Sequence, residues 1–267
     1  MSGSDTGRLA KGLFSGRRQG RLWFVIGALA SLAVLAFAVY QFAGRAEPEP
    51  MTGIVLSFDD RASINSWGES LQFLQDAGIK ATFFVDKFDA MTPEQIETLR
   101  ELARRGNEIG SHGFRHVNAA QLIEQGMTAE EYLDTEIHPS IQAMKELGFE
   151  CKSFAYPFGS TSEATDAALK EIFVTIRKVG PVGLYYDGTT APFVGSQFID
   201  GTNMTEERIE AMILKAQEVG GILSLGAHKI GPEGGVCWCS YDTLKIVADL
   251  AKKHRMPFYT MSELAEL

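Results

Sequence analysis

The stretch Gly53-Ile-Val-Leu-Ser-Phe-Asp-Asp60 (GIVLSFDD) is the segment of this 267-residue chain that decides the predicted fold. Its first six residues form a short apolar run, which is typical of a strand buried on both faces of a parallel sheet. Two adjacent carboxylates end the strand, and alternation along a strand predicts that Asp59 and Asp60 point in different directions. Such a pair is unfavourable without a cation or a proton between the charges, although taken alone it also fits a solvated turn.

Segments of the same kind alternate with helical patterns along the rest of the chain. Further strands are expected at residues 80–85, 153–156, 174–176, 222–227 and 256–260. A helical apolar spacing covers residues 64–74, and helices are expected to begin after Thr92, Thr128, Ser160, Thr205, Ser240 and, as a short one, from Ser262. The alternation predicts an α/β fold with a parallel sheet, open or closed into a barrel. In such folds the chemistry lies at the carboxyl ends of the strands.

Three more motifs carry residues suited to catalysis. Ser111–His116 (SHGFRH) places two histidines four residues apart, which on a helical turn would put both imidazoles within reach of one metal ion. Tyr156–Gly159 (YPFG) and Leu225–His228 (LGAH) follow strand-like runs. Each motif alone also fits surface histidines, a turn or a hydrogen-bonded histidine. Together, two histidines and one aspartate make three metal ligands with a position left for water, and the second aspartate and His228 remain as a base and an acid.

In this order the motifs resemble those of the polysaccharide deacetylases with a NodB homology domain, carbohydrate esterase family four. The resemblance covers roughly Thr52 to the C-terminus. The family's Thr/Ser-Phe-Asp-Asp, His-Ser/Thr-x-x-His, Pro-Tyr/Phe-Gly and Leu-x-x-His patterns match Ser57–Asp60, His112–His116 (with Gly113 at the small position), Pro157–Gly159 and Leu225–His228. The resemblance implies a distorted (β/α)7 barrel.

The resemblance also implies an activity, the hydrolysis of N-acetyl groups of an amino-sugar polysaccharide such as peptidoglycan, a chitin-like polymer or a poly-N-acetylglucosamine-like polymer. A divalent metal, expected to be Zn²⁺, is the implied cofactor. The implied roles are base for Asp59, metal ligands for Asp60, His112 and His116, acid for His228, and oxyanion donor for the backbone N–H of Phe158.

Two parts of the family pattern are missing from their usual places. The arginine that orients the base falls on Ala155, and the aspartate that tunes the acid histidine has no clear match. Arg177 is a candidate for the first role, with an ordinary surface arginine as the alternative. Asp187 and Asp200 are candidates for the second, each also explained as a turn aspartate. These departures leave open a weakly active or inactive envelope glycan-binding protein on the same fold, or a hydrolase of an O-acetyl ester, a formamide or an imide.

The N-terminal segment predicts export to a membrane. Residues 22–42 carry no charge, and as a helix they would be about 32 Å long, enough to cross a hydrocarbon core. Five basic residues precede this run and only Arg45 follows closely, which keeps the N-terminus in the cytoplasm. We expect a basic cytoplasmic tail (1–21), a transmembrane signal anchor (22–42), a linker (43–51) and an extracytoplasmic catalytic domain (52–267), single-pass in a bacterial-type cell membrane. The alternative is cleavage at Ala36-Phe37-Ala38, which would make the protein secreted.

Charge and cysteine content limit the partners. Residues 1–45 carry six basic side chains and one acidic one, whereas the remainder carries 19 basic and 33 acidic, a balance of −14. A domain with this much negative charge is a poor partner for nucleic acid. The expected partners are therefore an N-acetylated polysaccharide and, through the N-terminal helix, the membrane. Three cysteines are too few for a disulfide scaffold, although Cys151 paired with Cys237 or Cys239 would fit an exported domain.

Overall fold

The computed structural model describes residues 51–201, 203–233 and 235–267, which belong to one compact unit, Pro50–Leu267. The predicted tail (1–21) and signal anchor (22–42), and all but the last residue of the linker (43–51), lie outside the described residues, so they stay predictions. Within the described ranges, no helix has both the length and the apolar character that crossing a bilayer requires.

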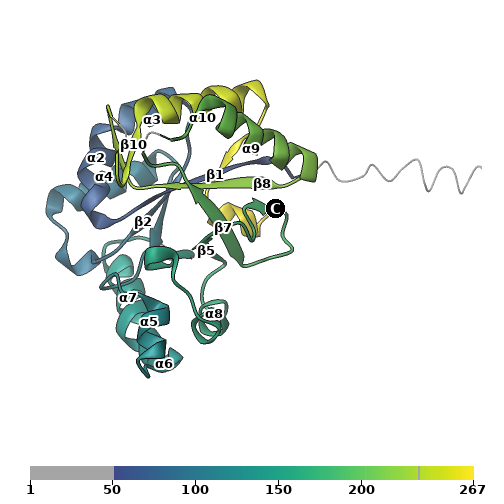
Figure 1. Cartoon of the computed structure of the whole chain (residues 1–267). Coiled ribbons are helices and arrows are strands. Elements are labelled where there is room, and N and C mark those ends of the chain that lie inside the picture. The colour runs from purple at the N-terminus through teal and green to yellow at the C-terminus, as the bar shows by residue number, and fades with distance from the viewer. Residues whose placement is uncertain (1–50, 202, 234) are drawn as a thin grey trace, which may run out of the picture. The chain divides into compact units, whose positions relative to one another are not determined.

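Seven parallel strands close into a barrel, in the order β1-β2-β3-β4-β5-β7-β8, with β8 pairing back onto β1. Figure 1 shows β1 and β8 running side by side through the centre of the unit. Their bounds are Gly53–Asp59 (β1), Thr82–Val85 (β2), Glu108–Ser111 (β3), Ser153–Ala155 (β4), Thr175–Val179 (β5), Phe193–Phe198 (β7) and Ile222–Ala227 (β8). The predicted (β/α)7 barrel is therefore confirmed, although β3 and β7 were not among the predicted strands.

The closure is uneven, which makes the barrel distorted. β3 meets β4 only through Ser111 and Phe154 in register. The first half of β1 pairs with β11 (Phe258–Tyr259) instead of β2, and the first half of β8 pairs with the antiparallel β6 (Tyr185–Tyr186). A separate pair, β9 (Lys229–Gly231) and β10 (Trp238–Ser240), follows β8.

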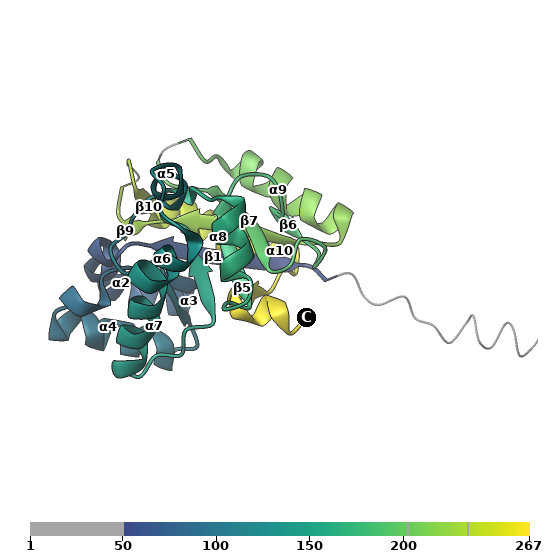
Figure 2. The ribbon, with the colours of Figure 1, turned by 90° about the horizontal axis from the view of Figure 1, so that it is seen from below.

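Helices surround the barrel on its outside, as Figures 1 and 2 show from two directions. Their bounds are Ile64–Glu69 (α2), Leu71–Asp76 (α3), Pro93–Arg104 (α4), Ala119–Glu124 (α5), Ala129–Tyr132 (α6), His138–Glu146 (α7), Glu163–Leu169 (α8), Glu206–Val219 (α9) and Tyr241–Lys253 (α10). A π-helical turn, Leu133–Ile137, joins α6 to α7, and 3-10 turns lie at Arg61–Ser63, Phe88–Ala90, Pro157–Gly159 and Ser262–Ala265.

The predicted capping signals are confirmed at most helix starts. Thr92 and Thr128 each form a full capping box, and the side chains of Thr205 and Ser240 each accept a backbone N–H of the first turn. The predicted start at Ser160 is wrong. Ser162 caps α8 instead, because its hydroxyl accepts the N–H of Thr165 and the Pro157–Gly159 turn occupies the residues just before.

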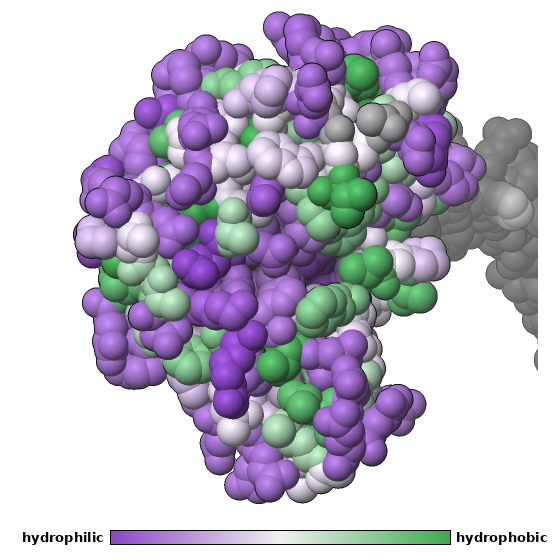
Figure 3. All heavy atoms as spheres, turned by 60° about the vertical axis from the view of Figure 1, so that its left-hand side comes forward, coloured by the Kyte–Doolittle hydropathy of each residue, from purple (hydrophilic) through white to green (hydrophobic). Residues whose placement is uncertain are grey.

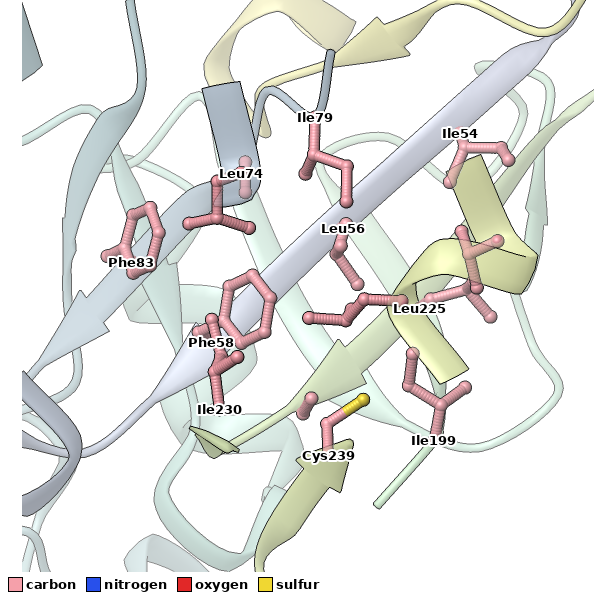
Figure 4. Packing of buried hydrophobic residues seen from close by; sticks show 14 of the residues in the cluster. Ile54, Leu56, Phe58, Leu74, Ile79, Phe83, Ile199, Leu225, Ile230 and Cys239 are labelled. Atoms are coloured by element: carbon pink, nitrogen blue, oxygen red, sulfur yellow. The ribbon is translucent and has the colours of Figure 1, made fainter. Parts of the chain in front are cut away.

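Alternation along β1 decides which side chains reach the site. Ile54, Leu56 and Phe58 point outward into the main core, between the strands and the helices (Figure 4). Val55 points the other way and packs in a second cluster with residues of β2, β4, β7 and β8, which is the barrel interior. Asp59 is four residues after Val55, so its side chain points to the same side of the strand. It therefore lies inside the barrel, at the carboxyl end of β1.

Candidate active site

Three ligand atoms converge where β1 and β3 end. One atom each of Asp60, His112 and His116 lie within 4.8 Å of one another. Asp60 Oδ1 is 3.2 Å from His116 Nε2 and 3.7 Å from His112 Nε2. Tetrahedral zinc with bonds of about 2.05 Å separates its ligand atoms by about 3.4 Å. The donor set therefore fits a divalent cation of this size.

A loop, and not a helix, brings the two histidines together. His112 follows the last residue of β3, and the chain then folds back through Gly113 (φ 83°) to His116 (φ 59°). The imidazole ring centroids end 4.8 Å apart. The prediction that both rings can reach one ion agrees with this placement, but the helical turn behind it is wrong.

Burial and hydrogen bonding prepare His112 as a neutral ligand. Its side chain is buried, and its Nδ1 lies 2.8 Å from the carbonyl oxygen of Ala155. A carbonyl can only accept, so Nδ1 carries the proton and Nε2 presents its lone pair toward Asp60. Burial also lowers the pKa of His112, which favours the unprotonated ring that metal binding needs.

Asp60 and His116 form an ion pair when no metal lies between them. Burial alone would raise the pKa of Asp60, but the hydrogen bond from His116 and the nearby histidine charges outweigh it and lower the pKa to about 2. Burial alone would lower the pKa of His116, but the bond to Asp60 outweighs it and raises that pKa. Metal binding at this site would therefore displace a proton from His116.

Asp59 faces the same point from inside the barrel and is paired with Arg177. Both side chains are buried, with relative exposures of 2 % and 1 %, and Arg177 Nη2 donates to Asp59 Oδ2 over 2.6 Å. Asp59 Oδ2 is 3.8 Å from His112 Nε2, and the buried Asp59 Oδ1 accepts no hydrogen bond from the described residues. This leaves one buried carboxylate oxygen of Asp59 without a hydrogen-bond donor among the described residues.

The position of Arg177 explains how an arginine can reach Asp59 without the usual motif. Ala155 on β4, where the motif's arginine falls, is the register partner of Arg177 on β5. The guanidinium packs against the rings of Phe84 and Phe198, 5.4 and 5.1 Å from their centroids. The alternative of a surface arginine is therefore wrong.

His228, directly after β8, is held by Asp200. Its Nδ1 lies 2.6 Å from Asp200 Oδ2, and its backbone N–H donates to Asp200 Oδ1 over 3.1 Å. Burial alone would lower the pKa of His228, but the bond to Asp200 and the potentials of Asp59 and Asp60 raise it. Asp200 follows β7, the neighbour of β8, so recognising β7 in the sequence would have selected it.

Asp187, the other candidate partner of His228, has a local structural role. Its exposed carboxylate accepts hydrogen bonds from the backbone N–H and the hydroxyl of Thr189, over 2.9 and 2.6 Å. Asp187 is therefore the turn aspartate of the alternative interpretation, and Asp200 occupies the place beside His228.

Phe158 lies beside the ligand cluster in the turn Pro157–Gly159. It has a left-handed backbone (φ 60°), and its ring centroid is 4.7 Å from that of His116. The first N–H groups of a helical turn have no partner within the turn, so the Phe158 N–H can donate to a group bound next to His116. Its side chain is 67 % exposed and forms part of the rim.

Figure 3 brings forward the side on which β1 and β8 end and shows hydrophilic side chains around a hollow, with hydrophobic patches at its edge.

The three cysteines are all free, so none of the disulfides considered from the sequence is present. Cys239 is buried and Cys237 exposed.

The polysaccharide deacetylase family model matches residues 46–176, a range that includes Asp59, Asp60, His112, His116 and Phe158. This part of the chain belongs to the family, whose enzymes hydrolyse N-acetyl amide bonds. No curated protein sequence matches the chain significantly.

Solved structures share the fold at low sequence identity. The peptidoglycan N-acetylglucosamine deacetylase Bc1960 is 20 % identical with a TM-score of 0.56, over 81 % of this chain and 89 % of that one. The CE4 domain of a xylanase from the hindgut metagenome of Trinervitermes trinervoides is 20 % identical (TM-score 0.54; 80 % and 90 % covered). A mutant of a CE4 family pseudoenzyme from Bacillus anthracis, with restored enzymatic activity, is 15 % identical (TM-score 0.52; 81 % and 68 % covered).

Proposed function

We propose that this protein is a metal-dependent hydrolase that removes N-acetyl groups from an extracytoplasmic amino-sugar polysaccharide. One observation carries the proposal: a three-ligand cluster, a buried carboxylate with an unpaired oxygen, and a histidine held by a second carboxylate meet at one end of the barrel. Family membership supports the N-acetyl substrate class. The apolar segment 22–42 supports the location.

The chain's own groups divide the reaction between them. A divalent metal held by Asp60, His112 and His116 would supply Lewis acidity, polarising the acetyl carbonyl and lowering the pKa of water. Asp59 takes the proton of the attacking water, while Arg177 fixes its carboxylate by donating to Oδ2.

The remaining groups serve the oxyanion and the leaving group. The N–H of Phe158 donates to the developing oxyanion. His228, whose pKa the bond to Asp200 raises, then delivers its proton to the departing amine nitrogen as the C–N bond breaks.

The alternative of an inactive glycan-binding protein rests on two residues missing from their usual places: the arginine that orients the base and the aspartate that tunes the acid histidine. In this chain Arg177 binds the base, Asp59, and Asp200 binds the acid, His228. Other residues therefore take the positions of the missing arginine and the missing aspartate. This favours turnover over binding alone.

Acetate release tests the proposed function directly. The full-length protein in detergent should release acetate from N-acetylated chitooligosaccharides or from peptidoglycan, lose this activity in a chelator, and regain it with added Zn²⁺. His112→Ala should stay inactive after Zn²⁺ is restored, because one of three ligands is gone. Release that a chelator does not change, or release from O-acetylated sugars alone, would contradict the proposal.

The pH profile reports on the pair of Asp200 and His228. His228 must be protonated to act as an acid, and Asp200 contributes to its raised pKa. Asp200→Asn removes that negative charge, so the pKa of His228 falls and the alkaline limb of the kcat profile moves to lower pH. NMR titration of the imidazole should show the same direction. Asp187→Asn, in an exposed turn, is the matched control and should leave the limb in place. An equal displacement in both variants would rule out the assigned pairing.

A further inference from the structure

Two of the three ligand residues have backbones that side chains rarely adopt. Asp60 has φ 79° and His116 has φ 59°, both in the left-handed region and neither a glycine. Such conformations persist where the surroundings hold them, and they are enriched at functional sites. Two buried carboxylates, Asp86 and Glu136, bind the chain beside these residues.

A buried carboxylate binds the chain next to Asp60. Asp86, which follows β2 and is 4 % exposed, accepts the backbone N–H of Arg61 on Oδ1 over 2.7 Å. Its Oδ2 faces the ammonium of Lys87 at 3.1 Å. The peptide group directly after the ligand is thus tied to a neighbouring strand end.

A second buried carboxylate binds the chain next to His116. Glu136, which is 1 % exposed, accepts the backbone N–H of Arg115 on Oε2 over 2.8 Å and the Arg115 Nε–H on Oε1 over 2.7 Å. Its carbonyl oxygen also accepts the N–H of Phe114 over 3.0 Å. Glu136 belongs to the π-helical turn Leu133–Ile137, a type of irregularity that is frequent at functional sites.

We propose that Asp86 and Glu136 are positioning residues, which hold Asp60 and His116 in the conformations that let them bind one divalent cation together. Neither offers a ligand atom to the three-residue cluster, and each acts through the peptide group beside a ligand. A further bond, from the N–H of Lys87 to the carbonyl of Phe114 over 3.2 Å, ties the two loops to each other. The inference rests on the metal site of the proposed function.

The physical reason is preorganisation. A buried carboxylate is stable only when its oxygens are bound, so these two groups take their N–H donors on folding, before any metal arrives. The ligand loops then need no ordering when the ion binds, and the affinity is correspondingly higher. Groups outside the ligand set that orient ligands in this way typically change metal affinity by about 10–100-fold when mutated.

Zn²⁺ affinity of the metal-free full-length protein, measured by chelator competition, tests this inference. Asp86→Ala and Glu136→Ala, which remove the acceptors of the Arg61 and Arg115 N–H groups, should each weaken Zn²⁺ binding by about 10–100-fold. Asp86→Asn keeps an oxygen for the Arg61 N–H and should recover most of the loss. Far-UV circular dichroism of each variant checks that it folds, and Glu136→Ala carries the comparison if Asp86→Ala does not fold.

Glu108→Ala is the matched control. Glu108 also accepts a backbone N–H, that of Ser262 over 2.9 Å, together with the hydroxyls of Thr82 and Ser153. It lies at the start of β3, whereas His112 follows the end of that strand, so its loss should lower the melting temperature without changing Zn²⁺ affinity.

The outcomes separate this inference from the proposed function. Unchanged affinity in Asp86→Ala and Glu136→Ala, or equal weakening in Glu108→Ala, would overturn the positioning role while wild-type Zn²⁺ binding stands. A wild-type protein that binds no divalent cation would instead refute the metal dependence itself, and this inference with it.

Discussion

Asp59→Asn should lower kcat/KM for deacetylation by about 10²–10⁴-fold, the usual contribution of a general base. Asparagine keeps the shape of the side chain but cannot take a proton from water. The carboxylate of Asp59, which lies 3.8 Å from His112 Nε2, is the proton acceptor that this change removes. Steady-state acetate release at saturating Zn²⁺ gives the size of the loss.

Asp60→Asn serves as the comparison variant, because Asp60, the residue next to Asp59, belongs to the ligand cluster. It should weaken both Zn²⁺ binding and turnover, whereas Asp59→Asn should weaken turnover and leave Zn²⁺ binding near the wild-type value. A turnover rate of Asp59→Asn close to that of the wild type would assign the proton transfer to another group.

Arg177→Met should lower the free energy of unfolding by about 3–5 kcal/mol, because it leaves the carboxylate of Asp59 buried without its partner. Both side chains of this pair are almost completely buried, and water cannot replace the guanidinium. Methionine fills much of the same apolar volume between the rings of Phe84 and Phe198, so the loss reports on the charge. Urea unfolding of the metal-free protein measures it.

Two further variants define the cause of that loss. Arg177→Met combined with Asp59→Asn should recover much of the stability, since no unpaired charge stays behind. Arg104→Met removes an arginine from an exposed ion-pair cluster with Glu97 and Glu101 and should change stability little, because solvent screens such pairs. If the double variant is as unstable as Arg177→Met, the loss comes from packing and not from charge.

Local patterns in the sequence were sufficient for the parts of the fold whose signal is contained in a few consecutive residues. The apolar run before Asp59 predicts a buried strand, and this strand is present. Alternation along it does not govern Asp60, which follows β1 with φ 79° and brings its carboxylate toward the same His112 Nε2 as Asp59 does. Thr92 and Thr128 mark the starts of helices because a cap requires its partner only three residues away. β3 (EIGS) and β7 (FVGSQF) were not predicted, because both strands are short and are interrupted by polar residues and glycine.

The sequence by itself determined the chemical types at the site: two adjacent carboxylates, a histidine pair and a late histidine, in an order that resembles one family. Only the tertiary structure decided their partners. Arg177 reaches Asp59 across 118 residues because the β4–β5 register places it beside Ala155. Asp200 reaches His228 because β7 lies next to β8. Periodicity records how each residue is oriented within its own element, whereas these pairs depend on strand order and barrel closure, which no local pattern contains.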